Sequence, residues 1–184
     1  MKTFVAGLIF GVLAIVVGGY LYFTTGMVPV AVTDPDMPFE KMLAHKALSA
    51  RIDKEMPKNI PISAPDEATY VGGASVYRDN CSVCHGLPGQ EETNIAKGMY
   101  PHPPQLFKGK GVTDDEVGES YWKVANGIRL TGMPGFRGKL SETEMWQVSL
   151  LVAKADRLPD AAKQTLTGPF LATPPVPAPP SPKK

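Results

Sequence analysis

The sequence has few of the residues on which most protein chemistry depends. Among its 184 residues are only two cysteines and three histidines, and its 19 Lys and Arg nearly balance its 18 Asp and Glu, for a formal net charge of +1. A chain with this balance has no large basic surface, so we expect no nucleic-acid partner. A single pair of cysteines also falls short of the four protein ligands that a structural zinc site normally uses.

Proline and glycine, in contrast, are abundant, with 19 and 18 residues, and the prolines crowd toward the C-terminus. The segment 159–184 has too few large apolar side chains to build a core and enough proline to favour an extended polyproline II path. We therefore expect residues 159–184 to form a Pro-rich extended tail.

The N-terminus carries a long apolar segment. There is no charged side chain between Lys2 and Asp34, and residues 4–23 form a dense apolar run. Twenty helical residues span about 30 Å, the thickness of a bilayer's hydrocarbon core, whereas the apolar part of a signal peptide is usually only about 7–15 residues. We expect residues 1–33 to be a retained single-pass anchor, with a cleaved signal peptide as the alternative. Positively charged residues next to a membrane span usually remain on the cytoplasmic side. Because Lys2 precedes the span, we expect the rest of the chain to lie outside the cytoplasm.

A juxtamembrane helix and a linker are predicted over residues 34–68. In PFEKMLAHKALSARIDKEM (38–56) an apolar stripe recurs at helical spacing, formed by Phe39, Met42, Leu43, Ala47 and Ala50. The following stretch, 57–68, contains three prolines, which break a helix and indicate a linker.

A compact domain is predicted over residues 69–158, with a pattern of helix, loop, helix, loop and helix. The first helix runs into Cys81, and the second covers TDDEVGESYWKVANGI. The third has the clearest start, because Ser141 and Glu144 form a capping box, and Pro159 is expected to end it.

The stretch CSVCHG (81–86) contains both cysteines and one histidine. Cys-x-x-Cys-His is the attachment pattern of a c-type haem: Cys81 and Cys84 would form thioethers with the two vinyl groups, and His85 would bind the iron. A redox dithiol and a metal site are the alternatives, but the chain has neither the alternating β and α pattern of a thioredoxin nor a second Cys pair.

With these residues the chain resembles the class I c-type cytochromes, in particular their membrane-anchored bacterial members. The matching stretches are GGASVYRDNCSVCHG and YWKVANGIRLTGMPGFRGKLSETEMWQVSLLV. The resemblance implies an all-α class I cytochrome c domain whose first and last helices cross, with Tyr77 and Gly72 or Gly73 meeting Trp146 and Leu150. It also implies a bacterial inner-membrane protein with its haem domain on the periplasmic side. The stretch GMYPHPPQLFKGKG departs from the shortest members.

The second axial ligand of the iron is predicted to be Met133. It lies in TGMPGF, the loop that carries the methionine ligand in the family, where Gly132 permits close backbone approach and Pro134 stiffens the chain. Thioether sulfur favours reduced iron. Met99, His102 and an open sixth position are the alternatives.

The predicted function is electron transfer through one covalently bound haem c, without catalytic residues. We expect a membrane-anchored subunit of a respiratory or dehydrogenase complex, with redox proteins of the membrane or periplasm as partners in a hetero-oligomer. The alternatives are a tethered shuttle between separate complexes, and a haem enzyme or gas sensor with an open iron site. Of the other polar candidates, Arg129 is either a haem propionate ligand or a solvated helix end, and His45 is a surface residue.

Overall fold

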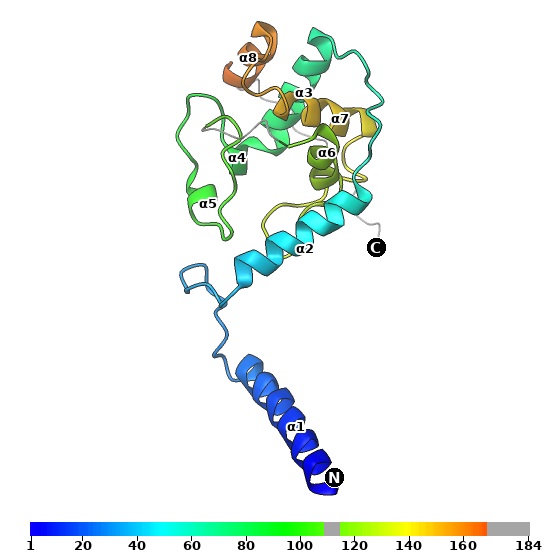
Figure 1. Cartoon of the computed structure of the whole chain (residues 1–184). Helices are drawn as coiled ribbons and strands as arrows, with labels where there is room; N and C mark the ends of the chain where they lie inside the picture. Colours follow the sequence, from blue (N-terminus) through cyan, green and yellow to red (C-terminus); the bar gives the residue numbers. More distant parts are fainter. Residues whose placement is uncertain (109–114, 169–184) are drawn as a thin grey trace, which may run out of the picture. The chain divides into compact units, whose positions relative to one another are not determined.

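The computed structural model describes residues 1–108 and 115–168, and the regular elements in these ranges are all helices (Figure 1). The predicted all-α class is confirmed. The helices are α1 (Lys2–Thr24), α2 (Glu40–Glu55), α3 (Glu67–Asn80), α4 (Ser82–His85), α5 (Asn94–Lys97), α6 (Val117–Asn126), α7 (Glu142–Val152) and α8 (Asp160–Thr167).

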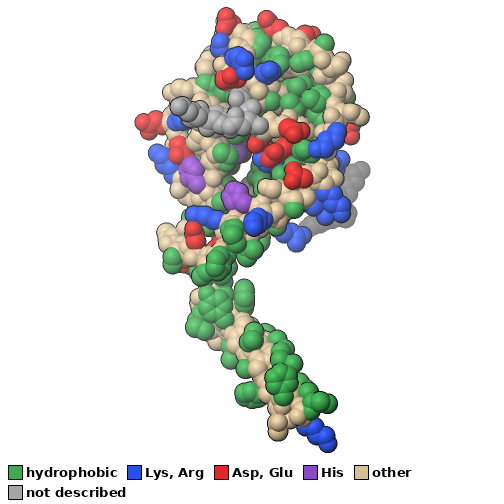
Figure 2. All heavy atoms as spheres, viewed as in Figure 1, with side chains coloured by type: hydrophobic (Ala, Val, Ile, Leu, Met, Phe, Trp, Pro, Cys, Tyr) green, Lys and Arg blue, Asp and Glu red, His purple; other side chains and the backbone are tan. Residues whose placement is uncertain are grey.

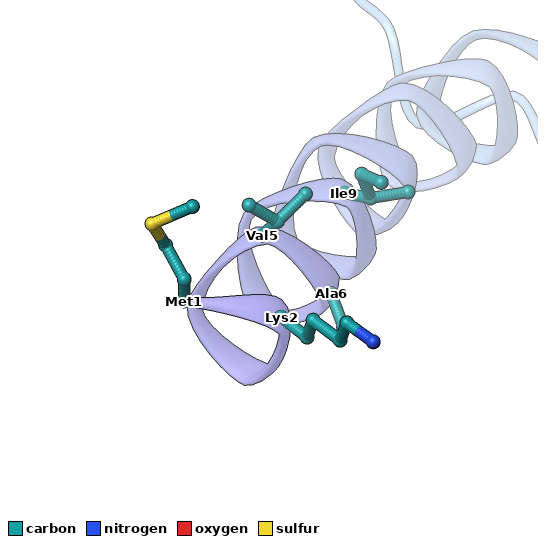
Figure 3. Close-up of a pocket in the computed structure, with 5 residues that line it drawn as sticks. All are labelled: Met1, Lys2, Val5, Ala6 and Ile9. Atoms are coloured by element: carbon teal, nitrogen blue, oxygen red, sulfur yellow. The ribbon is translucent and has the colours of Figure 1, made fainter.

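The chain divides into two compact units, Met1–Arg51 and the part that begins at Ile52. In the first unit, α1 is long and apolar enough to cross a membrane, and none of its side chains is buried. Figure 2 shows mainly hydrophobic side chains on its visible face. The shallow hollow in Figure 3 is lined by Met1, Lys2, Val5, Ala6 and Ile9 of this helix alone, so it has no second wall to enclose a ligand.

The second unit is built on a crossing of α3 and α7, the first and last helices of the predicted domain (Figure 1). At the crossing a Cβ atom on Gly73 would collide with the backbone carbonyl of Gln147 and touch Leu151. Tyr77 and Leu151 are fully buried in the core cluster that forms around this contact. The absence of a side chain at Gly73 therefore permits the backbones to approach.

The expected partners of this contact were partly wrong. Gly73 meets Gln147 and Leu151, whereas Trp146 belongs to a second buried cluster, in which its ring stacks on Tyr121 with ring centres 4.1 Å apart. Residues on one helix that differ by one position point about 100° apart. A small error in register therefore assigns a side chain to a different neighbour.

Side chains at the helix starts explain where α3 and α7 begin. The Asp66 carboxylate accepts hydrogen bonds from the backbone N–H and the hydroxyl of Thr69, at 2.8 and 2.6 Å. At α7 the predicted capping box is present, because Glu144 N donates to Ser141 Oγ while the Glu144 carboxylate accepts from Ser141 N. However, α7 ends at Val152, well before Pro159.

The compact part begins earlier than predicted, at Ile52 and not at Thr69. Ile52 and Met56 are buried, and the carbonyl of Pro57 lies so close to Gly118 that a Cβ there would collide with it. Ile62 packs on the second cluster. Residues 57–66, which contain three prolines, have no regular structure, and Glu67 already begins α3. Because this stretch packs on the domain, it is not a free linker.

The predicted tail also needs correction, because residues 160–167 form α8 and fold onto the domain. Ala162 and Leu166, four residues apart on one helix face, are buried in the core cluster against α3. Arg78 of α3 donates a hydrogen bond to the Thr165 carbonyl at 2.9 Å. The proline count of the whole segment concealed this short apolar repeat. The remainder of the predicted tail, 169–184, lies outside the described residues.

We predict that Gly73→Ala destabilises the domain by about 1–3 kcal/mol, because the new Cβ overpacks against a backbone that cannot rotate away. Gly72→Ala is the matched control. Its Cβ would meet only the end of the Gln147 side chain, which can move, and alanine favours a helix over glycine by about 0.5–1 kcal/mol. Chemical denaturation of the two variants measures the difference; equal stabilities would contradict the crossing at Gly73.

We also predict that Leu166→Ala lowers the free energy of unfolding by about 2–5 kcal/mol, since it removes a fully buried side chain from the core cluster. Leu130→Ala makes the same chemical change at a side chain that is 92% exposed, and should cost no more than about 0.5 kcal/mol. If the two substitutions had the same effect on thermal unfolding, α8 would not be part of the folded domain.

Candidate functional site

The two cysteines and His85 lie on one tight helical turn. Cys81 is both the C-cap of α3 and the N-cap of α4, and the N–H groups of Cys84 and His85 donate to its carbonyl at 3.1 and 2.9 Å. Residues three and four apart in a helix point to the same side. Gly86 ends the turn with φ +74°, a conformation that suits glycine. The turn therefore presents both thiols and the imidazole together.

The segment 103–106 holds this turn from the other side through three hydrogen bonds. His85 Nδ1 lies 2.8 Å from the Pro104 carbonyl, Leu106 N donates to the His85 carbonyl at 3.3 Å, and Gln105 Nε2 donates to the Cys84 carbonyl at 3.0 Å. Because a carbonyl only accepts, His85 Nδ1 must carry the proton, and its Nε2 keeps a lone pair.

Burial lowers the pKa of His85, although the hydrogen bond to the Pro104 carbonyl acts in the opposite direction. The neutral imidazole is therefore favoured, which is the form that binds metals. Sequence reasoning missed Pro104 and Gln105. Both lie in the stretch that departs from the shortest relatives, and Pro104 acts through a backbone carbonyl, which leaves no signal in the residue type.

These residues line a cavity with about 830 Å³ of empty space, part of it open to solvent. Its walls are mostly apolar. They come from the CSVCH turn, the segment 99–106, the end of α6, the loop 131–136 and α7: Tyr77, Cys81, Cys84, His85, Met99, Pro101, His102, Pro103, Leu106, Val124, Ile128, Met133, Phe136, Val148 and Val152 are among the lining residues.

The thiols do not have the electrostatics of a redox dithiol. Burial, with a smaller contribution from Cys84, raises the pKa of Cys81 to about 12, whereas a reactive redox cysteine has a lowered pKa. Both cysteines are unpaired by disulfide. Among the described residues no group of three or more His, Cys, Asp or Glu side chains could hold a metal ion by itself. The dithiol and metal-cluster alternatives thus find no support here.

Met133 is on the wall of the cavity, in a loop whose backbone is closed by hydrogen bonds. Ile128 N donates to the Met133 carbonyl at 3.2 Å, and Met133 N donates to Thr131 Oγ1 at 3.1 Å. Gly127 packs under this loop with φ +68°, where a Cβ would collide with the backbone of residues 133–135. The loop therefore fixes where the Met133 side chain starts.

The rival ligands Met99 and His102 line the same cavity, so proximity alone does not separate them from Met133. Their other contacts differ. His102 Nε2 pairs with the Glu92 carboxylate, and the Met99 methyl group packs closely on Gly132. Of the other candidate residues, Ile128 lines the cavity and Tyr121 is buried in the second cluster. Arg129 and His45 are exposed.

Comparison with known proteins shows which family this part of the chain resembles. Residues 68–150 match the family model described as cytochrome c oxidase, cbb3-type, subunit III. This part of the chain is similar to a c-type cytochrome domain. A search of curated proteins finds no match. Among solved structures, a chain of the reducing HAO-like protein complex of Kuenenia stuttgartiensis is 24% identical, with a TM-score of 0.45. The match covers 55% of this chain and 50% of the other, so this chain spans about half the length of the protein that it matches.

The cavity of the cytochrome domain fits the haem c that its family implies. It offers two adjacent thiols for covalent attachment, a neutral imidazole whose Nε2 is available, and apolar walls for a flat, largely apolar macrocycle. Electron transfer is the activity that the matched family implies for such a domain.

Tyr77→Phe should lower the free energy of unfolding of the cytochrome by about 1–3 kcal/mol. The Tyr77 hydroxyl donates to the buried Gly86 carbonyl at 2.8 Å, directly after His85, and its loss leaves that carbonyl without its donor. Tyr70→Phe is the control, because Tyr70 packs on the same cluster and its hydroxyl makes no hydrogen bond within residues 1–108 and 115–168. Denaturation of both variants is the measurement, and equal stability of the two would refute a structural role for the Tyr77 bond.

Proposed function

We propose that this protein is a membrane-anchored electron-transfer subunit with one haem c, and that it is not an enzyme. The observation that carries the proposal is the gathering of the CSVCH turn and the TGMPGF loop around one apolar cavity. The sequence contains a single Cys-x-x-Cys-His motif, which supports one covalent haem.

Each residue of the turn has a distinct task in this proposal. Cys81 and Cys84 attach the cofactor through thioethers, and His85 donates the Nε2 lone pair to the iron. The Pro104 carbonyl holds the imidazole in the required tautomer and orientation, as groups behind metal-binding histidines commonly do. When bound, haem c supplies a one-electron iron couple; the apolar walls limit water at the iron and so tune its potential.

We assign the second axial position to Met133. Its backbone is held at both N–H and carbonyl, so the side chain can bind without a large rearrangement of its loop. His102 is engaged with Glu92, and Met99 packs against Gly132. A filled sixth position leaves no open coordination site for a substrate, which favours an electron carrier over an enzyme or gas sensor.

The membrane arrangement follows from α1. Its length and composition suit a single-pass anchor, and Lys2 at its start with Asp34 and Asp36 after it support a periplasmic haem domain. The family description names a subunit of an oxidase, which favours a fixed subunit of a respiratory complex over a shuttle between complexes. Redox proteins of the same membrane or of the periplasm are the proposed partners.

Met133→Ala tests both the ligand and the function. We expect loss of the weak near-infrared sulfur-to-iron band, a lower midpoint potential and new binding of carbon monoxide by the reduced protein, because the thioether that favours reduced iron is gone. The haem should remain attached through Cys81 and Cys84. Absorption spectroscopy and a redox titration of the purified holoprotein give these readouts.

Met99→Ala and His102→Ala are the matched controls, since both residues line the same cavity. They should retain the band and the potential. A Met133→Ala protein with an unaltered spectrum would show that another residue binds the iron. Strong carbon monoxide binding by the unmodified reduced protein would instead favour the enzyme or sensor.

A further inference from the structure

Helix α2 has two apolar faces, and the structure covers only one of them. Ile52 is 2% exposed, and Met56 just beyond the helix is also buried, so this face packs in the second unit. At about 100° per residue, Ala50 lies about 160° around the helix from Ile52. The face that contains Ala50 therefore points away from the packed one.

The uncovered face carries large apolar side chains. We call Phe39, Met42, Leu43, Ala47 and Ala50 the outer stripe; at about 100° per residue they fall within an arc of about 140°. Phe39, Met42 and Leu43 are 70%, 46% and 59% exposed. Lys46 lies within the same arc, and the apolar stem of a lysine can follow such a surface while its ammonium group reaches water.

The turn that leads into α2 holds Phe39 outward. Met37 N donates to the Glu40 carboxylate at 2.8 Å, and Leu43 N donates to the Phe39 carbonyl at 2.9 Å. Phe39 itself has φ +66°, in the left-handed region that bulky residues rarely adopt. Such a conformation costs free energy, and contact of the exposed ring with an apolar surface would offset that cost.

The outer stripe continues the apolar surface of the anchor. Between α1 and α2, the side chains of Met27, Val30 and Val32 are also exposed. The Asp34 carboxylate accepts hydrogen bonds from the N–H groups of Val30 and Ala31, both at 2.8 Å, and so folds this segment into a turn. Exposed apolar side chains thus recur along the chain from α1 through residues 27–32 to α2.

We propose that the outer stripe lies on the surface of the bilayer that α1 spans. Phe39, Met42 and Leu43 insert at the boundary between headgroups and acyl chains, and Lys46 reaches the lipid phosphates. Lipid is the occupant that fits, because the stripe follows the anchor in the chain and places one cation among apolar side chains. This inference rests on the proposed membrane anchor and is independent of the haem ligands.

Two variants of the full-length holoprotein, each with one added cysteine, test the proposal: Ala50→Cys in the outer stripe and Ala44→Cys outside it. In the holoprotein Cys81 and Cys84 are bound to the haem, so only the added thiol takes the label. Both alanines are exposed, and they lie about 120° apart on α2. Each variant is spin-labelled and reconstituted in phosphatidylethanolamine and phosphatidylglycerol vesicles. We expect the ratio of oxygen to nickel-chelate accessibility to be at least about threefold higher at position 50, although position 44 is nearer the anchor in the chain.

Equal ratios, or a higher ratio at position 44, would overturn the proposal. An Ala14→Cys label in α1 separates this failure from failure of the anchor: a lipid-exposed label at 14 with an aqueous one at 50 refutes the outer stripe alone, whereas an aqueous label at 14 refutes the anchor as well. A position-50 label that is aqueous in vesicles but immobilised in native membranes would assign the stripe to a protein partner, and so would also overturn the proposal. The haem absorption spectrum checks that each variant is folded.

Discussion

The close approach of α3 and α7 at Gly73 is the constraint on which the rest of the cytochrome domain depends. The Gln147 carbonyl occupies the place of a side chain there, so the two backbones come together and bury Tyr77 and Leu151. α3 continues from this contact directly into Cys81, while α7 contributes Val148 and Val152 to the cavity. A single contact between two helices therefore positions both the core and one wall of the cavity.

The position of His85 depends on a second constraint, in which backbone carbonyls are the hydrogen-bond acceptors. Three hydrogen bonds join residues 103–106 to the CSVCH turn, and two of them use the carbonyls of Pro104 and Cys84. The His85 tautomer is thereby set by a group that every residue type possesses. The prolines at 101, 103 and 104 stiffen this segment. The Pro104 carbonyl is therefore positioned at a small cost in conformational entropy.

Local patterns predicted the parts of this structure that local chemistry determines. The CSVCH motif, the capping box of Ser141 and Glu144, and the apolar run of α1 each depend on spacing within a few residues. Long-range contacts were not predictable in the same way. Nothing in the sequence pairs Pro104 with His85, or Pro57 with Gly118, and the Ala162 and Leu166 repeat was too short to stand out in a proline-rich segment.

The corrected boundary at Ile52 adds the end of α2 and the stretch that follows it to the compact unit. A free linker over residues 57–68 would have left these residues without contacts to the domain. Instead Met56 is buried, Ile62 packs on the second cluster and Glu55 accepts a hydrogen bond from Trp122 Nε1 at 3.2 Å. α2 is one continuous helix whose last turn belongs to the second unit. The compact domain therefore begins inside a helix, and a fragment that starts at Thr69 would lose the packing of Met56 and Ile62.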